Sequence, residues 1–413
     1  MLNGKNMNSK TNKILFIILI ILISIGAIFL YYLYTKKSSG DISNSEISMD
    51  LPTSNGTNGG IDISSGDLPG VSIENDDSLT FADNQKKKLF QLSSQNVVDY
   101  WISSTTDLAN SGDILKDNLY YINKDGEIHK ILKGNSDEVI ATSPYGPPVS
   151  INQSLDGSKV VVSFESGKVA LYSIDKKTWE LLTNNISSAS ISPDGKSVAY
   201  LTLVKGTKNL YIKDINRTKP ITTLIISLAI QDVSIDWVDN DRIFLLPKQS
   251  KDFEGQIWYI DIKTKTLKFY GSGFGFSAIF SKLNNLSLSF SSQNYGKKML
   301  TSFSDKSGNN KGSASFATFK EKCVFSYSTP FAYCAIPKNS NRTSSVYFPD
   351  DFLKKSIFFN DYIYKVDVEN KVFYNLLSLD SMALDAISLK EKNNQLFFIN
   401  RLDNKLYMYK IEE

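Results

Sequence analysis

The stretch SPDGKSVAY, residues 192–200, followed by LYIKD at residues 210–214, contains the pattern from which the fold can be predicted. It reads as the end of one strand, a tight Asp-Gly turn, a second strand, and a third strand that ends in aspartate. Asp-Gly dipeptides accept the positive φ angles that short hairpin turns require. The stretch therefore predicts a small antiparallel sheet made of consecutive short strands.

The third-strand pattern, apolar-aromatic-x-apolar-Asp, recurs along the chain. Full copies end at Asp175, Asp214, Asp261 and Asp367, and weaker copies end at residues 132, 305 and 410. Successive copies are separated by 43, 39, 47, 44, 62 and 43 residues. A period in the forties with four short strands per unit is typical of a β-propeller. We therefore predict an all-β fold for residues 86–413, a propeller of about seven blades in which the sixth unit is enlarged.

The last unit contains only three candidate strands, near residues 383–389, 395–400 and 405–411. The segment 90–103 precedes the first full unit and contains two short apolar runs, residues 90–92 and 97–102. This segment could supply the missing fourth strand. Such a pairing would join the two ends of the propeller and remove the open sheet edges of an unclosed array.

Residues 14–34 form a run of 21 residues without a charge. A helix of that length is about 30 Å long, the thickness of a membrane's hydrocarbon core. A cleaved signal peptide is the alternative, but the run is long for one and no small-x-small cleavage site follows it. We predict a transmembrane helix, with residues 1–13 as a short cytoplasmic tail. The lysines before the helix favour an N-terminus inside and a propeller outside the plasma membrane.

Residues 35–85 are predicted to be a flexible acidic linker. The part 38–85 has nine acidic residues and no Lys or Arg, and it is rich in Ser, Gly, Asn and Asp. Such a segment cannot bury enough apolar surface to fold alone. Residues 86–413 contain 41 basic and 34 acidic residues, a net charge of +7. This mild excess, without a long basic run, argues against a nucleic-acid partner.

The repeat SPDGKSVAY resembles the TolB-like and WD40-like propeller repeats of bacterial envelope proteins. Residues 86–413 are more similar to uncharacterised, singly membrane-anchored propeller proteins of candidate-phyla-radiation bacteria. The similar stretches are KLFQLS at 88–93, KCVF at 322–325, YCAIP at 333–337, FPDDF at 348–352 and DYIYKVD at 361–367. The resemblance implies a propeller at the cell envelope, and it implies no particular activity.

The enlarged sixth unit holds the only two cysteines of the chain, Cys323 and Cys334. If residues 327–330 form a turn, the two cysteines face each other across a hairpin, close enough for a disulfide. Disulfides persist in exported domains. Two buried free thiols are the alternative. A redox-active pair is less expected, because the C-x-x-C motif is absent.

The enlargement itself is an insertion at about residues 338–360, between the second and third strands. In a propeller, such loops lie on the same face as the loops that join one blade to the next. Aromatic residues beside charges suit a recognition surface. The candidate partner-binding residues are Arg342, Tyr347, Phe348, Asp350, Asp351 and Phe352. The alternative is a lid folded over the blade, with Tyr347 and Phe348 as its small core.

Catalytic motifs are absent from the sequence. The single histidine, His129, excludes a multi-histidine zinc site. The sequence has neither the G-x-S-x-G motif of hydrolases nor a P-loop. His129 falls on a predicted strand, where a packing role is expected. We therefore predict no catalytic residue, no cofactor and no metal site.

Three functions are consistent with these observations. The first is a membrane-anchored, extracytoplasmic, non-catalytic binding or scaffolding module for an envelope protein or peptide. The second is a sensor or adhesin that binds glycans through exposed aromatic rings. The third is a glycan-active enzyme that uses acidic residues in the central channel. We expect the first.

Overall fold

The computed structural model describes residues 88–103, 118–132, 136–230, 232–327, 329–338, 346–379 and 382–411. The predicted tail 1–13, transmembrane helix 14–34 and linker 35–85 lie outside these residues. Within the described part of the chain, no helix has the length and apolar character that crossing a membrane requires.

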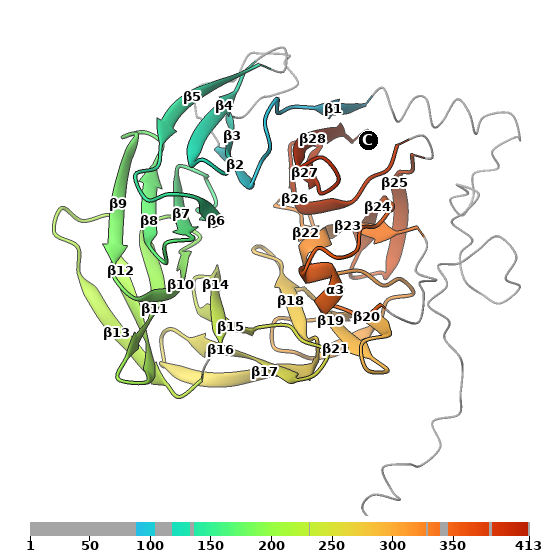
Figure 1. Ribbon diagram of the computed structural model, residues 1–413. Helices are drawn as coiled ribbons and strands as arrows, with labels where there is room; N and C mark the ends of the chain where they lie inside the picture. The colour runs from blue at the N-terminus through green and yellow to red at the C-terminus, as the bar shows by residue number, and fades with distance from the viewer. Residues whose placement is uncertain are drawn as a thin grey trace, which may run out of the picture. The chain divides into compact units, whose positions relative to one another are not determined.

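The described chain folds into seven antiparallel sheets of four strands each, arranged around a central axis as the blades of a propeller (Figure 1). In each blade the strands pair in order, from an innermost strand near the axis to an outermost strand at the periphery. The fold class is therefore the predicted one, and the number of blades is seven.

The first four blades follow one another without interruption. Blade 1 contains β2 (Asp99–Ser103), β3 (Asn118–Ile122), β4 (Glu127–Ile131) and β5 (Asp137–Thr142). Blade 2 contains β6 (Pro148–Gln153), β7 (Lys159–Phe164), β8 (Val169–Ser173) and β9 (Thr178–Thr183). Blade 3 contains β10 (Ile186–Ile191), β11 (Ser197–Val204), β12 (Thr207–Asp214) and β13 (Thr222–Leu228). Blade 4 contains β14 (Val233–Asp239), β15 (Arg242–Pro247), β16 (Glu254–Asp261) and β17 (Thr266–Phe274).

The last three blades include the enlarged unit and the ring closure. Blade 5 contains β18 (Ser277–Phe280), β19 (Ser287–Gln293), β20 (Lys298–Ser304) and β21 (Asn310–Ser313). Blade 6 follows the 3-10 helix η2 (Lys320–Lys322) and contains β22 (Cys323–Phe325), β23 (Phe331–Pro337), β24 (Asp361–Asp367) and β25 (Val372–Leu377), with helix α3 (Asp350–Leu353) in its insertion. Blade 7 contains β26 (Ala386–Lys392), β27 (Gln395–Asn400), β28 (Lys405–Lys410) and β1 (Leu89–Gln91).

The sequence pattern predicted the position of the third strand correctly in every blade. The third strands β4, β8, β12, β16, β20, β24 and β28 end at residues 131, 173, 214, 261, 304, 367 and 410, within two residues of the predicted positions. The second strands that precede them are buried because each lies between neighbouring blades; Val160 and Val162 in β7, for example, have no exposed surface.

The ring closes through strands from both ends of the described chain. Strand β1 pairs with β28, with Phe90 opposite Met408. The prediction that segment 90–103 completes the last blade is right for its first apolar run. Its second run instead forms β2, the innermost strand of blade 1. Apolar side chains of blades 1 and 7 share one hydrophobic cluster, so the closure is also packed.

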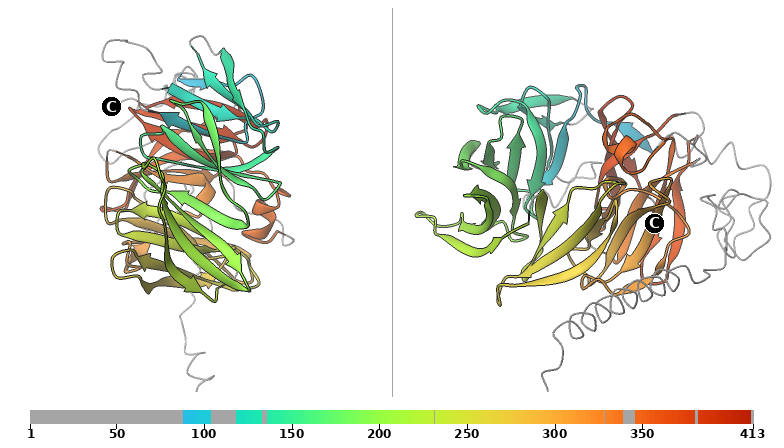
Figure 2. Two further views of the ribbon diagram at one scale, coloured as in Figure 1. Left: turned by 90° about the vertical axis from the view of Figure 1, so that its left-hand side faces the viewer. Right: turned by 60° about the horizontal axis from the view of Figure 1, so that its bottom comes forward.

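The loops divide between two faces of the propeller, seen edge-on in Figure 2. Loops between first and second strands and between third and fourth strands lie on one face, which we call the turn face. Loops between second and third strands and loops between blades lie on the other, which we call the insertion face. The insertion after β23 is on this second face, as its position between a second and a third strand predicts.

Candidate functional site on the insertion face

The described part of the insertion, residues 346–360, is a lid with an aromatic core. Phe348 and Phe352 are only 4% and 3% exposed. Together with Phe359 they pack on Phe319, which lies in the loop between blades 5 and 6; the ring centroids lie 5.6, 4.2 and 5.6 Å from that of Phe319. Two of the candidate partner-binding side chains are therefore interior, where their rings hold the lid on the propeller.

The two candidate aspartates fix the backbone of the lid and of its neighbour. An Asp350 carboxylate oxygen accepts the backbone N–H of Lys251 at 2.8 Å. An Asp351 carboxylate oxygen accepts the backbone N–H of Tyr347 at 2.7 Å. Both carboxylates are thus already used within the protein. Arg342 lies outside the described residues.

Tyr347 is at the surface, with 37% of its area exposed. The Lys297 ammonium lies 3.5 Å from the centre of its ring, and the Lys251 ammonium lies 5.0 Å from it. These are cation–π distances, and they orient the ring between two loops. The alternative interpretation of the insertion therefore needs one correction: the core of the lid contains Phe348 and Phe352 rather than Tyr347 and Phe348.

The lid reaches across blade 5 to blade 4 and creates what we call the three-loop surface: residues 248–254, 294–298 and 346–355. The backbone N–H of Phe348 donates to the Gly296 carbonyl at 2.7 Å. Gly296 has φ +83°, and a Cβ there would lie 2.8 Å from the Phe348 carbonyl oxygen and 2.9 Å from Lys251 Cβ. Only glycine permits so close an approach of the three loops.

Two aromatic side chains project from this surface with little cover. Phe253, in the loop after β15, is 74% exposed, and Tyr295, in the loop after β19, is 91% exposed. Neither residue was among the sequence-based candidates. One sequence feature could have identified them. Each is an aromatic residue in a short loop between a second and a third strand, and the insertion is a loop of the same class.

A buried group of four charged side chains lies beneath the lid, and the sequence analysis did not identify it. Lys322 donates to the carboxylates of Asp361 and Asp385, and all three residues are at most 1% exposed. Arg401 donates to the second oxygen of Asp385 at 3.3 Å. The cation and anion charges balance, which is the condition for burying them.

The same group ties the lid to blade 7. Arg401, in the loop after β27, donates to the carbonyl oxygens of Phe352 and Ile357 at 3.2 and 3.4 Å. Its guanidinium group lies 4.4 Å from the Phe352 ring centre. Burial, opposed by the nearby Lys322 charge, raises the pKa of Asp361 to about 6. The lid is therefore bound to four consecutive blades, 4 to 7.

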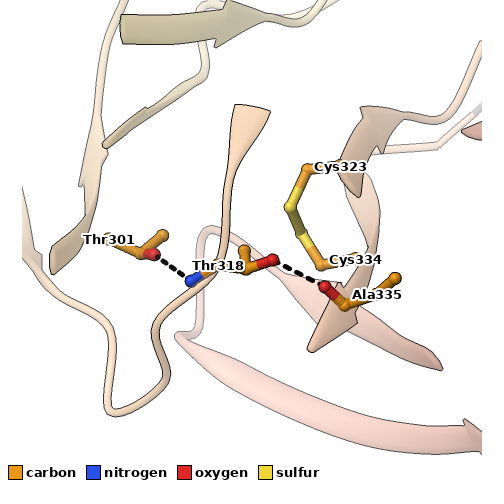
Figure 3. Close-up of a disulfide and its surroundings, with 5 residues drawn as sticks. All are labelled: Thr301, Thr318, Cys323, Cys334 and Ala335. Atoms are coloured by element: carbon orange, nitrogen blue, oxygen red, sulfur yellow. Dashed lines mark hydrogen bonds between the residues drawn. A yellow bond between two sulfur atoms is a disulfide. The ribbon is translucent and has the colours of Figure 1, made fainter. Parts of the chain in front are cut away.

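Cys323 and Cys334 are joined by a disulfide between the two innermost strands of blade 6 (Figure 3). The two residues are direct partners in the β22–β23 ladder, with an S–S distance of 2.02 Å and a Cα–Cα distance of 4.2 Å. This is the register expected from a turn at residues 327–330. Nearby, Thr318 donates to the Ala335 carbonyl at 2.6 Å and so joins the incoming loop to blade 6.

The inner strands of blades 4 to 6 line a hollow of about 290 Å³. Its polar side chains include Asp236, Lys282 and Glu321, and its apolar wall includes Ile279 and Phe325. The volume is at the lower limit for a small-molecule site. Ser326, one of its lining residues, donates its hydroxyl hydrogen to a buried Glu391 carboxylate oxygen at 2.7 Å.

The remaining ionisable groups near the channel have structural partners. Asp99 accepts the backbone N–H groups of Tyr100 and Ile151 at 2.8 and 3.2 Å. Lys390 donates to the Gln153 amide oxygen at 3.1 Å, and burial lowers the pKa of this lysine. Among the described residues, no group of three His, Cys, Asp or Glu side chains has an arrangement suited to a metal ion.

His129 packs inside blade 1. It is 1% exposed and stacks on Tyr121 with a centroid distance of 4.6 Å. Its Nδ1 lies 3.1 Å from an Asp137 carboxylate oxygen. The lone histidine therefore has the packing role expected from its position on a strand.

Comparison with protein-family models and with curated proteins finds no match for this chain. Solved propeller structures do match. The β-propeller domain of Cps50 (Swd1) from Myceliophteria thermophila is 9% identical over 78% of this chain and 100% of that chain, with a TM-score of 0.51. U3-55K is 10% identical over 79% and 99%, with a TM-score of 0.54. A chain of the mitotic checkpoint complex is 12% identical over 79% and 92%, with a TM-score of 0.51. At these identities the likeness supports the propeller fold alone.

Proposed function

We propose that this chain is a non-catalytic binding module, held at the plasma membrane by residues 14–34, whose extracytoplasmic propeller binds an envelope protein or peptide. The observation that carries the binding role is the three-loop surface, where Phe253, Tyr295 and Tyr347 are exposed on neighbouring loops. Exposed aromatic side chains that gather on one surface mark interaction sites. The repeat sequence further supports a relationship with TolB-like envelope propellers.

The rigidity of this surface favours a binding role. Asp350, Gly296 and Arg401 fix the lid to its neighbours through backbone hydrogen bonds and close packing. A surface that is ordered before it binds loses less conformational entropy when a partner docks. The aromatic side chains are thus presented on a fixed framework.

The extracytoplasmic location is supported by two independent features. Residues 14–34 have the length and composition of a membrane-spanning helix. The disulfide between Cys323 and Cys334 belongs to the class of bonds that persist in oxidising compartments. Protease added to intact cells should remove the propeller if it is outside. Protection of the propeller until the membrane is opened would contradict this location.

Photocrosslinking in cells tests the binding role. A photoreactive residue replaces Tyr295, whose side chain is 91% exposed, so the substitution leaves the packing intact. The matched control replaces Leu283, which is 51% exposed in a loop of the turn face. We expect a recurrent protein crosslinked from residue 295 and not from residue 283. Absence of protein products from both positions in a folded, well-expressed protein would overturn the protein-binding role and favour the glycan alternative.

A further inference from the structure

On the three-loop surface, the acidic side chains all have partners within the protein, whereas some of the lysine ammonium groups have none among the described residues. Six lysines lie in its three segments, against four carboxylates. Each carboxylate already has a partner within the protein. Asp350 and Asp351 accept backbone N–H groups, Asp252 pairs with Lys251, and Glu254 accepts the hydroxyl hydrogen of Ser272 at 2.6 Å.

Three of the six lysines have no ion-pair partner within the described protein. Lys248, Lys354 and Lys355 are exposed, and none of their ammonium groups has a carboxylate within ion-pair distance among the residues that the structure describes. Lys248 lies in the same loop as Phe253, and Lys354 and Lys355 lie in the lid, whose Phe348 backbone N–H donates to the Gly296 carbonyl next to Tyr295. The surface therefore combines apolar anchors with cations that have no anion of their own.

The turn face has a different arrangement. Several of its lysines and arginines lie beside the aspartates of the turns, as in the pairs Arg217–Asp214 at 2.7 Å, Arg242–Asp239 at 2.8 Å and Lys263–Asp241 at 2.8 Å. Other lysines of this face, Lys176 and Lys219 among them, are exposed and have no carboxylate within ion-pair distance among the residues that the structure describes. The described loops of the turn face expose no large aromatic side chain, so the combination of unpaired cations with exposed aromatic rings distinguishes the three-loop surface from it.

From this difference we infer that the partner of the three-loop surface is an acidic protein segment that carries apolar side chains. Its carboxylates would lie against Lys248, Lys354 and Lys355, and its apolar side chains would cover Phe253 and Tyr295. Complementary charge selects among partners and increases the association rate, while the buried aromatic contacts supply most of the affinity. The inference rests on the proposed binding role of this surface and adds the chemistry of the partner.

Three synthetic peptides test the inference by fluorescence anisotropy with the full-length protein. The first alternates glutamate with leucine and phenylalanine. The second has lysine in place of every glutamate, and the third has serine in place of every apolar residue. We expect the first peptide to bind about tenfold more tightly than either of the others at low ionic strength, with the preference reduced by added salt.

Matched double variants locate the effect. K248E/K354E reverses two unpaired lysines of the three-loop surface, and K176E/K219E reverses two exposed lysines of the turn face, with the same change in net charge. The first variant should weaken binding of the acidic apolar peptide about tenfold, and the second less than twofold. Equal weakening by both, or equal binding of the lysine-containing peptide by the unaltered protein, would overturn the inference.

The two proposals fail in different ways. If residue 295 crosslinks to a protein in cells but the acidic peptide shows no preference, the acidic-partner inference is wrong and the binding role stands. If no protein is crosslinked from residue 295, the binding role itself is wrong. The variant pair F253S and Y295N provides a further check, because loss of both rings should also weaken the acidic apolar peptide about tenfold.

Discussion

The two faces of the propeller are built by different means. The turn face is made of short loops in which an aspartate fixes its own turn: Asp194 accepts the hydroxyl hydrogen of Ser192 at 2.7 Å and the backbone N–H of Lys196 at 3.1 Å. The insertion face over blades 4 to 6 is made of loops that depend on one another, since Lys251 and Asp350 meet across 99 residues of sequence. Local contacts therefore complete the first face, and long-range contacts complete the second.

This difference indicates where a partner can act. A face whose turns are completed locally, and whose described loops expose no large aromatic side chain, offers a partner no aromatic anchor. The insertion face retains unpaired lysines and exposed rings although its framework is fixed by the buried charges beneath the lid. The predictions below compare the two faces, beginning with the largest expected effect.

Removing the central buried cation should have the largest effect. Lys322→Met leaves Asp361 and Asp385 buried without their ammonium partner, and we expect a loss of about 3–5 kcal/mol in the free energy of unfolding. The control on the turn face is Lys196→Met, which breaks an exposed pair at 3.8 Å and should cost less than about 1 kcal/mol. Urea unfolding of both variants measures the contrast. Similar losses would contradict the distinction between the faces.

Two equivalent glycines of the turn face should respond unequally. Gly157 and Gly195 both follow aspartate in a first-to-second-strand turn, with φ +68° and +66°. A Cβ at Gly157 would lie 2.0 Å from the Ile102 carbonyl oxygen, whereas at Gly195 the nearest atom is the Ser154 Cβ at 3.1 Å. Gly157→Ala should cost about 2–4 kcal/mol and Gly195→Ala about 1–2 kcal/mol.

Thermal or urea unfolding of the two glycine variants provides the test. The expected difference arises because Gly157 touches the backbone of the neighbouring blade, which cannot move aside as a side chain can. An equal loss in both variants would show that the strain of the turn, rather than the contact between blades, sets the effect.

The disulfide should contribute less than the buried charges. Its two cysteines are separated by 11 residues, and closing a loop of that size in the unfolded chain is worth about 2–3 kcal/mol. The double variant C323S/C334S should lose this amount and keep the β-sheet circular dichroism spectrum of the parent. Adding a reductant should destabilise the parent and leave the variant unchanged. If reductant also destabilised the variant, the destabilisation of the parent could not be assigned to the disulfide.

The pH dependence of stability should have opposite signs at the two faces. Burial raises the folded-state pKa of Asp361 to about 6 from an ordinary value of 3.8, so its protonated form favours folding. This contribution is complete below about pH 4 and is lost as the pH rises through 6. Burial works against ionisation of Asp194 as well, but hydrogen bonds from Ser192 and Lys196 lower its pKa, so its contribution is lost in acid.

We therefore expect the free energy of unfolding to increase by about 1 kcal/mol between pH 7 and pH 5, and to fall below about pH 4 as the turn-face aspartates become protonated. Asp361→Asn should remove the increase and leave the acid loss. Stability curves from urea unfolding at several pH values measure both. A variant that keeps the increase would show that another group produces it.

The sequence predicted the parts of the molecule that repeat. The third-strand aspartates and the Asp-Gly turns are local patterns, so the blade number and strand order follow from one stretch and its copies. The cysteine pairing was also predictable, because one hairpin determines which residues are opposite each other. The closing strand followed from the missing fourth strand of the last unit.

The candidate site was only partly predictable, because its contacts are not local. Phe348 and Phe352 have the same local pattern as exposed recognition residues, and only packing against Phe319 makes them core. Lys322 and Asp385 meet across 63 residues, and nothing in either stretch indicates the other. Phe253 and Tyr295 can be recognised as parts of one surface only when the contacts of the lid with their two loops are known.

Lysine footprinting in intact cells tests the distinction between the faces most directly. A membrane-impermeant acylating reagent is applied to cells and to the purified full-length protein, and the modified lysines are quantified by mass spectrometry. We expect Lys248 and Lys354 to be less modified in cells than in the purified protein, and Lys176 and Lys219 on the turn face to be modified equally in both. Equal modification of all four lysines in both samples, or protection of the turn-face lysines alone, would contradict the account.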